Sequence, residues 1–371
     1  MTMTARVDAA IDAALGSRIV GCVVLINREG ERVYARAAGL ADREAGASVV
    51  EDTIFRLASC TKPIVATAVL VLADMGLLSV DDPVTKYLPF LVPTAPDGST
   101  PVITIRQLLT HTSGITYDSP PHDVQRGAGP GPSLSLEENL RRLGRGSLAF
   151  APGARWEYGM SIDVLGGVVG AINGKISDVE AALTRWVTGP LGMIDTHFFV
   201  RDPARLATAY GDATPAPFRM GEPQTVYNDP ANPDKAEVFS PGRIMDAGAP
   251  QSGGAGMAGT ASDFMKLLEC WRSGDLLTPA SRQSALSNQI GPLFRPNDPG
   301  QQFGFVGAVI ADAKASGWQR AGMVQWGGIW GNNWIVDPVT DTNIVVFTNT
   351  MREGCNGPFR EEIRDAVFGD G

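Results

Sequence analysis

The stretch FRLASCTKPIVATAVLVLADMGLLSVDDPV, residues 55–84, carries the strongest structural signal in the chain. Its apolar residues predict a buried helix over 63–78, and Ser59 and Lys62 stand where this helix begins. A lysine on a core-facing turn loses hydration, which is costly unless its ammonium is neutralised or hydrogen-bonded. The position of Lys62 therefore calls for a chemical explanation.

Ser59 and Lys62 are three residues apart, so a helix would place their side chains on the same side and close together. A serine hydroxyl is a poor nucleophile until a base accepts its proton, and burial that lowers the pKa of a lysine would let Lys62 act as that base. The helix N-terminus would also favour the developing alkoxide. Ser-x-x-Lys alone occurs by chance in many proteins, so the prediction depends on further motifs.

Two further motifs carry candidate groups. Tyr158 follows a Pro-Gly turn in PGARWEYGMSIDVLGGVVG (152–170), where a phenol beside a lysine could relay protons; the alternative is an anchor tyrosine at a helix start. In QWGGIWGNNW (325–334), two glycines precede a strand-like run and permit close backbone approach. The amides of Ile329 and Ser59 could then form an oxyanion hole, the alternative being a simple turn.

The order SxxK, Tyr, WGG resembles the penicillin-binding-protein-like serine hydrolases, the superfamily of class C β-lactamases, D-aminopeptidases and family VIII carboxylesterases. The resemblance covers nearly the whole chain and includes FRLASCTKPIVA, ITIRQLLTHTSGI and VTGPLGMIDTHF. It implies that Ser59 is the acylated nucleophile and that Lys62 and Tyr158 are its base and proton-relay pair.

Departures from the family pattern narrow the expected substrate. Met160 occupies the place of the asparagine in the Tyr-x-Asn motif of β-lactam-handling members, and Trp326-Gly327-Gly328 replaces their Lys-Thr-Gly. These four residues are expected to border the substrate, with no cation for a substrate carboxylate and with an aromatic wall. Both changes resemble the family VIII esterase branch, so an apolar ester is the expected substrate.

The order of predicted elements indicates an α+β fold. A helix over 4–15 and a hairpin of two strands come first, helices fill the middle, and strand-like runs with a last helix return at the end. Both termini should therefore pair in one antiparallel sheet flanked by terminal helices, beside a mostly helical inserted domain, as in the β-lactamase/transpeptidase-like fold. The predicted division is 1–62 with 285–371 for the sheet domain and 63–284 for the helical one, with the active site at their junction. Pro/Gly-rich connections at 117–135 and 211–240 are predicted to be active-site loops.

Composition excludes several partners. The 371 residues carry a net charge of -9 without a block of lysine or arginine, so neither nucleic acid nor an anionic membrane is expected. The sequence shows neither a signal-peptide pattern nor an apolar run of the roughly 20 residues that span a bilayer, which predicts a soluble, cytoplasmic protein. Its four cysteines form no CxxC pair and are expected to be free thiols: Cys22, Cys60, Cys270 and Cys355.

Rival motifs are weak. GGAGMAG (253–259) matches GxGxxG, but no predicted strand leads into it, so nucleotide binding is not expected. His111, His122 and His197 match no zinc-binding spacing, and neither a metal nor a cofactor is expected. The chain has no G-x-S-x-G elbow, which argues against a Ser/His/Asp esterase, and His111 is expected to be a structural hydrogen-bonding residue.

The sequence thus predicts a metal-free serine hydrolase that cleaves esters of small or medium acyl groups through an acyl-enzyme. A D-stereospecific amidase or aminopeptidase, with weak β-lactamase activity, is the alternative among enzymes. A binding module that keeps the fold without turnover is the alternative from another class. The sequence does not indicate the physiological substrate or the oligomeric state.

Overall fold

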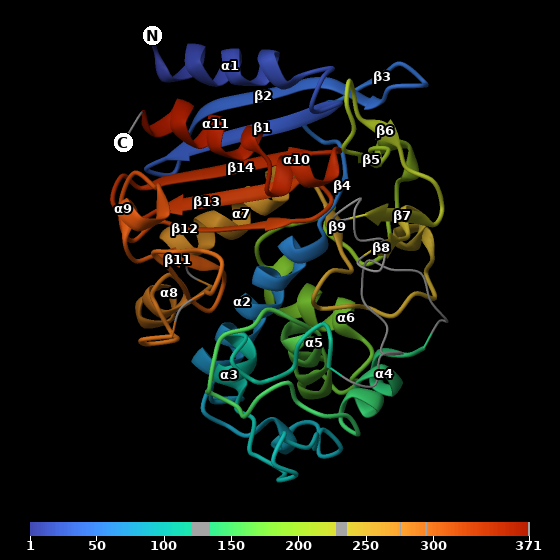
Figure 1. Ribbon diagram of the computed structural model, residues 1–371, viewed down its shortest axis with the longest axis vertical. Helices are drawn as coiled ribbons and strands as arrows, with labels where there is room; N and C mark the ends of the chain where they lie inside the picture. The colour runs from blue at the N-terminus through green and yellow to red at the C-terminus, as the bar shows by residue number, and fades with distance from the viewer. Residues whose placement is uncertain (120–133, 228–235, 275, 294, 370–371) are drawn as a thin grey trace.

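An eight-stranded antiparallel sheet forms the upper part of the molecule, and helices form the lower part (Figure 1). The computed structural model describes residues 1–119, 134–227, 236–274, 276–293 and 295–369. The strand order is β10-β11-β12-β13-β14-β1-β2-β3. These strands are β1 (Gly21–Arg28), β2 (Glu31–Asp42), β3 (Ala47–Ser48), β10 (Gln301–Phe303), β11 (Ala308–Ile310), β12 (Val324–Gly328), β13 (Asn332–Asp337) and β14 (Thr342–Thr348).

The two ends of the chain meet in the middle of this sheet. Strand β1 pairs antiparallel with β14, with Leu25 opposite Val345, which confirms the predicted pairing of the termini. The predicted hairpin between β1 and β2 turns through Glu29 and Gly30, whose φ angles are 53° and 83°. Positive φ at both central residues suits the right-handed twist of the flanking strands.

Helices cover both faces of the sheet because its central strands are apolar on both sides. Val24 of β1 packs in one core cluster with residues of α1 (Met3–Ala14) and α11 (Pro358–Phe368). Val23, which points the other way, belongs to the main core together with residues of α7 (Ala261–Arg272). The alternation of side chains along a strand thus divides β1 between two cores.

Helix α2 (Thr61–Asp74) is the centre of the helical part, and its residues 61–72 are all buried. A helix that is apolar all round is stable only when surrounded, and α5 (Ser161–Ile172) packs directly against it. The other helices are α3 (Ile105–Leu109), α4 (Leu136–Leu143), α6 (Val179–Leu183), α8 (Pro279–Ala285), α9 (Ala313–Ser316) and α10 (Met351–Cys355). Short strand pairs complete the fold: β4 (Phe55–Arg56) with β9 (Ala258–Gly259), β5 (Tyr210–Gly211) with β6 (Phe218–Arg219), and β7 (Gln224–Tyr227) with β8 (Ala236–Phe239).

The structure refines several predicted elements. Within the predicted helical middle, the segment DVEAALTRWVTGPLG (178–192) forms α6 followed by a π-helical turn at 184–188. The division into a sheet domain and a helical domain stays a prediction, and α7, which lies within the predicted helical range, packs against β1 and β14. Of the predicted active-site loops, residues 120–133 and 228–235, and with them His122, lie outside the described part of the chain. In the described ranges, no helix is long and apolar enough to cross a membrane.

Candidate active site

Ser59 stands on a tight turn between strand and helix. Strand β4 leads into a 3₁₀ turn at Ala58–Cys60, and α2 begins at the next residue. Ala58 has φ 43°, a left-handed conformation that is unfavourable for a residue with a side chain. The turn buries Ala58 and Cys60 and leaves Ser59 partly exposed at the start of α2. The predicted place of the serine, at the beginning of a buried helix, is confirmed.

Lys62 is buried, with 4% of its surface exposed, and its ammonium has three acceptors. Nζ donates to the Ser59 hydroxyl and to the Tyr117 hydroxyl, each at 3.2 Å. The third acceptor, at 2.6 Å, is the main-chain carbonyl of Gly254. These three bonds use the whole donor capacity of the ammonium, which satisfies a buried lysine. The predicted contact between Ser59 and Lys62 is confirmed.

The pKa of Lys62 contradicts the simplest form of the sequence hypothesis. Burial acts to lower this pKa, but Tyr117, Tyr158 and Asp163 nearby act to raise it, and the net pKa is raised. The expectation that burial alone turns Lys62 into a neutral amine is therefore wrong in direction. At neutral pH the lysine is an ammonium, and its surroundings hold the proton there.

Two tyrosines flank the ammonium, and sequence analysis identified only one of them. Tyr158 lies with its ring centre 4.7 Å from Nζ of Lys62, and its hydroxyl accepts the indole N–H of Trp326 at 3.1 Å. Tyr117, the missed residue, follows the HTSGI segment in a loop. Burial, partly opposed by Lys62, raises the pKa of Tyr117 to about 12. The Tyr117 hydroxyl is thus bonded to the lysine directly and the Tyr158 ring lies against it, although no helical spacing links Tyr117 to the pair.

His111 supports the Tyr158 segment. It is 1% exposed, its Nδ1 accepts the amide N–H of Gly159 at 3.3 Å, and its ring centre lies 4.5 Å from that of Tyr158. Burial, together with the positive charges of Lys62 and Arg295, holds the pKa of His111 well below its usual range. His111 is thus a neutral hydrogen-bonding residue, as the sequence predicted.

The glycines of strand β12 bring its end against the nucleophile turn. A Cβ atom on Gly328 would lie 2.1 Å from the carbonyl oxygen of Leu57, so only glycine permits this approach. Ile329 follows directly and lines the same cavity as Ser59. This arrangement is compatible with an oxyanion hole made by the two amides, a role that stays a prediction.

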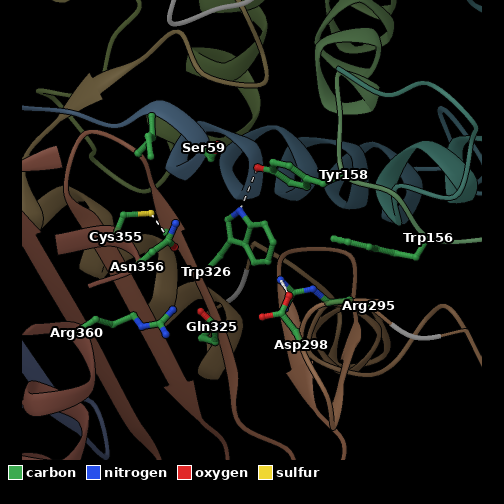
Figure 2. A pocket seen from close by; sticks show the side chains of 12 residues that line it. Ser59, Trp156, Tyr158, Arg295, Asp298, Gln325, Trp326, Cys355, Asn356 and Arg360 are labelled. Carbon is green, nitrogen blue, oxygen red and sulfur yellow. Dashed lines mark hydrogen bonds and ion pairs between the residues drawn. The ribbon is translucent and has the colours of Figure 1, made fainter. Parts of the chain in front are cut away.

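A cavity of about 480 Å³ opens beside Ser59 (Figure 2). Trp156, Tyr158 and Trp326 form its aromatic wall, with the rings of Tyr158 and Trp326 5.1 Å apart. Gly327 also lines it. The predicted aromatic wall around Trp326 is therefore present.

Charged residues also line the cavity, which contradicts the expectation that no cation borders the substrate. Arg295 and Arg360 both line it, together with Asp298 (Figure 2). Arg295 is 8% exposed, pairs with Asp298 at 2.8 Å and lies 4.9 Å from the centre of a Trp326 ring. The sequence reasoning failed here because these arginines come from segments far from the three motifs.

Two predicted substrate-binding residues are not among those that line the cavity. Met160 is 3% exposed and packs in the main core at the start of α5. Gly328 instead faces the nucleophile turn. All four cysteines are free and buried, as predicted. No group of three or more His, Cys, Asp or Glu side chains suited to a metal occurs among the residues with described positions.

A serine that contacts a buried lysine, beside a tyrosine and a glycine-lined strand, defines the serine hydrolases with an SxxK nucleophile motif. The chain matches the family model described as Beta-lactamase over residues 7–367, and the protein belongs to this family. It is a serine hydrolase of β-lactamase fold, which confirms the resemblance to penicillin-binding-protein-like enzymes.

Similar proteins include esterases. The chain is 44% identical to Esterase EstB of Burkholderia gladioli, over 99% of this chain and 95% of that protein. The solved structure of EstCE1, a hydrolase with promiscuous acyltransferase activity, superimposes with a TM-score of 0.93 at 37% identity, over 99% and 98% of the two chains. A penicillin-binding protein homologue from Caulobacter crescentus shares the fold, with a TM-score of 0.75 at 19% identity over 100% and 98%.

Proposed function

We propose that the protein is a carboxylesterase that forms an acyl-enzyme on Ser59. The observation that carries the proposal is the 3.2 Å contact between Lys62 Nζ and the Ser59 hydroxyl at the edge of an aromatic-walled cavity. Similarity to EstB and to EstCE1 supports an ester as the substrate. The substrate class is small or medium acyl esters.

Acylation begins when the Ser59 oxygen attacks the ester carbonyl and its proton passes to the cluster of Lys62 and the two tyrosines. Because the pKa values of Lys62 and Tyr117 are raised, both hold their protons at neutral pH, and the cluster must first lose one proton to the solvent to become a base. Because these groups are coupled, the apparent pKa of this proton loss is a property of the cluster rather than of one residue. The amides of Ser59 and Ile329 then stabilise the negative charge that develops on the carbonyl oxygen.

The leaving alcohol receives a proton from Tyr158 in this mechanism. The Trp326 N–H occupies a lone pair of the Tyr158 oxygen, so the phenol proton is free to point toward the leaving group. The acyl group rests against the aromatic wall, and water releases it by the same steps in reverse. An apolar acyl chain gains free energy from burial against Trp156 and Trp326.

A D-amidase or a weak β-lactamase is the second candidate, because Arg295 and Arg360 could pair with a carboxylate in the cavity. A parallel assay of p-nitrophenyl butyrate, D-alanine p-nitroanilide and nitrocefin at one pH separates these functions. We expect kcat/KM for the ester to exceed the others by at least about tenfold, since p-nitrophenoxide leaves without protonation.

Ser59→Ala should abolish ester turnover and labelling by a fluorophosphonate probe without loss of the folded structure. Turnover at the wild-type rate in this variant would end the proposal. If the wild type were labelled but did not hydrolyse esters, Ser59 would remain the proposed nucleophile and an ester would be ruled out as the substrate. A cytoplasmic location is also proposed, because four buried free thiols suit a reducing compartment.

A further inference from the structure

We infer that Asp163 is a positioning residue for Lys62, acting through the glycine-rich segment at 252–254. The inference rests on the proposed acyl-enzyme function and names a residue that deepens it. It also gives a role to the GGAGMAG run, which the sequence left without one.

Asp163 lies in the first turn of α5, five residues after Tyr158. Its Oδ1 accepts the hydroxyl of Ser252, and it accepts the amide N–H of Gly254 at 3.2 Å. The Ser252 hydroxyl in turn accepts the amide N–H of Ala255 at 3.1 Å. One carboxylate oxygen thus fixes both sides of the turn that contains Gly254.

The glycines allow this turn to lie directly on α5. A Cβ atom on Gly254 would lie 2.2 Å from Oδ2 of Asp163, and one on Gly253 would lie 2.8 Å from the carbonyl oxygen of Ile162. On the helix side, Gly166 meets the α carbon of Gly253 in the same way, since its Cβ would be 3.3 Å away. Small residues on both partners therefore allow the segment to pack closely against the helix.

The opposite side of the turn faces the catalytic lysine. The Gly254 carbonyl accepts Lys62 Nζ at 2.6 Å, the shortest of the three bonds that the ammonium makes to Ser59, Tyr117 and Gly254. Asp163 bonds the amide of Gly254, and the carbonyl of the same residue bonds the lysine. Loss of the carboxylate would release the carbonyl, and a shift of about 1 Å in a positioned group can cost about a hundredfold in rate.

The charge of Asp163 acts in the same direction as its hydrogen bonds. Tyr117, Tyr158 and Asp163 raise the pKa of Lys62, and Asp163 is the carboxylate among these three groups. Other groups act on the two residues as well. The positive charge of Lys62 acts to lower the pKa of His111 and of Cys60, and the negative charge of Asp163 acts to raise the pKa of Arg243. Without the carboxylate, the positive charges of Lys62 and Arg243 have less opposing charge nearby, which also favours loss of the Lys62 proton.

The experiment compares Asp163→Asn with Asp163→Ala, and its readout is the rate of Ser59 labelling by a fluorophosphonate from about pH 6 to pH 10. Asparagine keeps an oxygen acceptor for Ser252 and Gly254 but removes the charge. We expect its labelling profile to shift to lower pH by about one pH unit. Alanine removes the acceptor as well, and we expect its maximal rate to fall by about tenfold or more.

Asp263→Asn is the matched control, because Asp263 also lies in the first turn of a helix, α7, and accepts bonds from Asp195 and Thr196. It should lose stability without a shift in the labelling profile. A wild-type maximal labelling rate in a folded Asp163→Ala enzyme would overturn the positioning role, and an Asp163→Asn profile that coincides with the wild type would overturn the role of the charge. Labelling does not require an ester substrate, so failure of the esterase proposal would appear separately, as a wild type that labels but does not hydrolyse esters.

Discussion

Trp326 donates its indole N–H to the Tyr158 hydroxyl across 3.1 Å. The tryptophan stands in the place of the lysine of the Lys-Thr-Gly motif in the β-lactam-handling enzymes that the sequence resembles. A neutral donor therefore orients this phenol in the present protein. The arrangement leaves the Tyr158 proton free to point away from Trp326, and the indole adds no charge beside the phenol.

Trp326→Phe should lower kcat for ethyl butyrate, an alkyl ester whose alcohol must be protonated as it leaves, by about tenfold, because the ring remains but the donor that orients Tyr158 is lost. Tyr158→Phe should lower kcat by about two orders of magnitude, since it removes a proton-transfer group. Steady-state kinetics of both variants at one pH measures the difference. A Trp326→Phe enzyme with unchanged kcat would show that the hydrogen bond has no catalytic effect.

Tyr117→Phe should lower kcat by about tenfold with little change in KM, because Lys62 loses one of its three acceptors. Tyr87→Phe is the control, since the Tyr87 hydroxyl donates to Asp82 and Tyr87 does not line the cavity. It should leave kcat unchanged. Equal kinetics for the Tyr117 variant and the wild type would remove Tyr117 from the proton relay.

The rate should rise with pH through the neutral range. The raised pKa of Lys62 and the pKa of about 12 for Tyr117 mean that both groups hold their protons at pH 7. The fraction of enzyme that has lost one of these protons, and can act as a base, grows with pH. We expect kcat/KM to increase by up to about tenfold per pH unit from near pH 6 upward.

His111 cannot produce this rise, because its pKa is held well below its usual range and it is neutral throughout. A pH-rate series with p-nitrophenyl butyrate, corrected for spontaneous hydrolysis, tests the prediction. Lys62→Met should both lower the rate and flatten the profile. A wild-type profile that falls from neutral to alkaline pH in a folded enzyme would contradict the assignment of the base.

Gly328→Ala should destabilise the protein by about 1–3 kcal/mol and reduce ester turnover, because the added Cβ would overlap the Leu57 carbonyl and displace the nucleophile turn. Thermal unfolding and kcat measure the two effects. Gly221→Ala is the control, since its Cβ would meet nothing closer than 3.6 Å. Normal stability and turnover in the Gly328 variant would show that the turn and the strand are not tightly coupled.

The sequence predicted the parts of the site that local geometry determines. Ser59 and Lys62 are in contact because they are three residues apart at the start of a helix. Trp326 lines the cavity, and its resemblance to a family motif allowed this position to be predicted. The pairing of β1 with β14 followed from strand patterns at both ends of the chain. The Ser59–Lys62 contact and the strand pairing depend on spacing and periodicity, which can be read from the sequence, whereas the place of Trp326 came from the family resemblance.

Tertiary contacts decided the rest. Tyr117 reaches Lys62 from a loop, and the direction of the Lys62 pKa depends on Tyr117, Tyr158 and Asp163 together, so neither has a local signal in the sequence. Arg295 enters the cavity from the connection between α8 and β10. Met160 was misplaced because a residue just before a helix can point into the core as readily as into a cleft.

The pairing of β1 with β14 also constrains when the enzyme can become active during its synthesis. The centre of the sheet joins segments at opposite ends of the chain, so the sheet cannot close until the last strand is available. Such distant pairings carry a large loop-closure cost and slow folding. Because β12, which approaches the nucleophile turn, belongs to the same late segment, a ribosome-bound chain that ends before β12 holds Ser59 without the strand that completes its surroundings. The surroundings of Ser59 are therefore incomplete until the segment that carries β12 has been made.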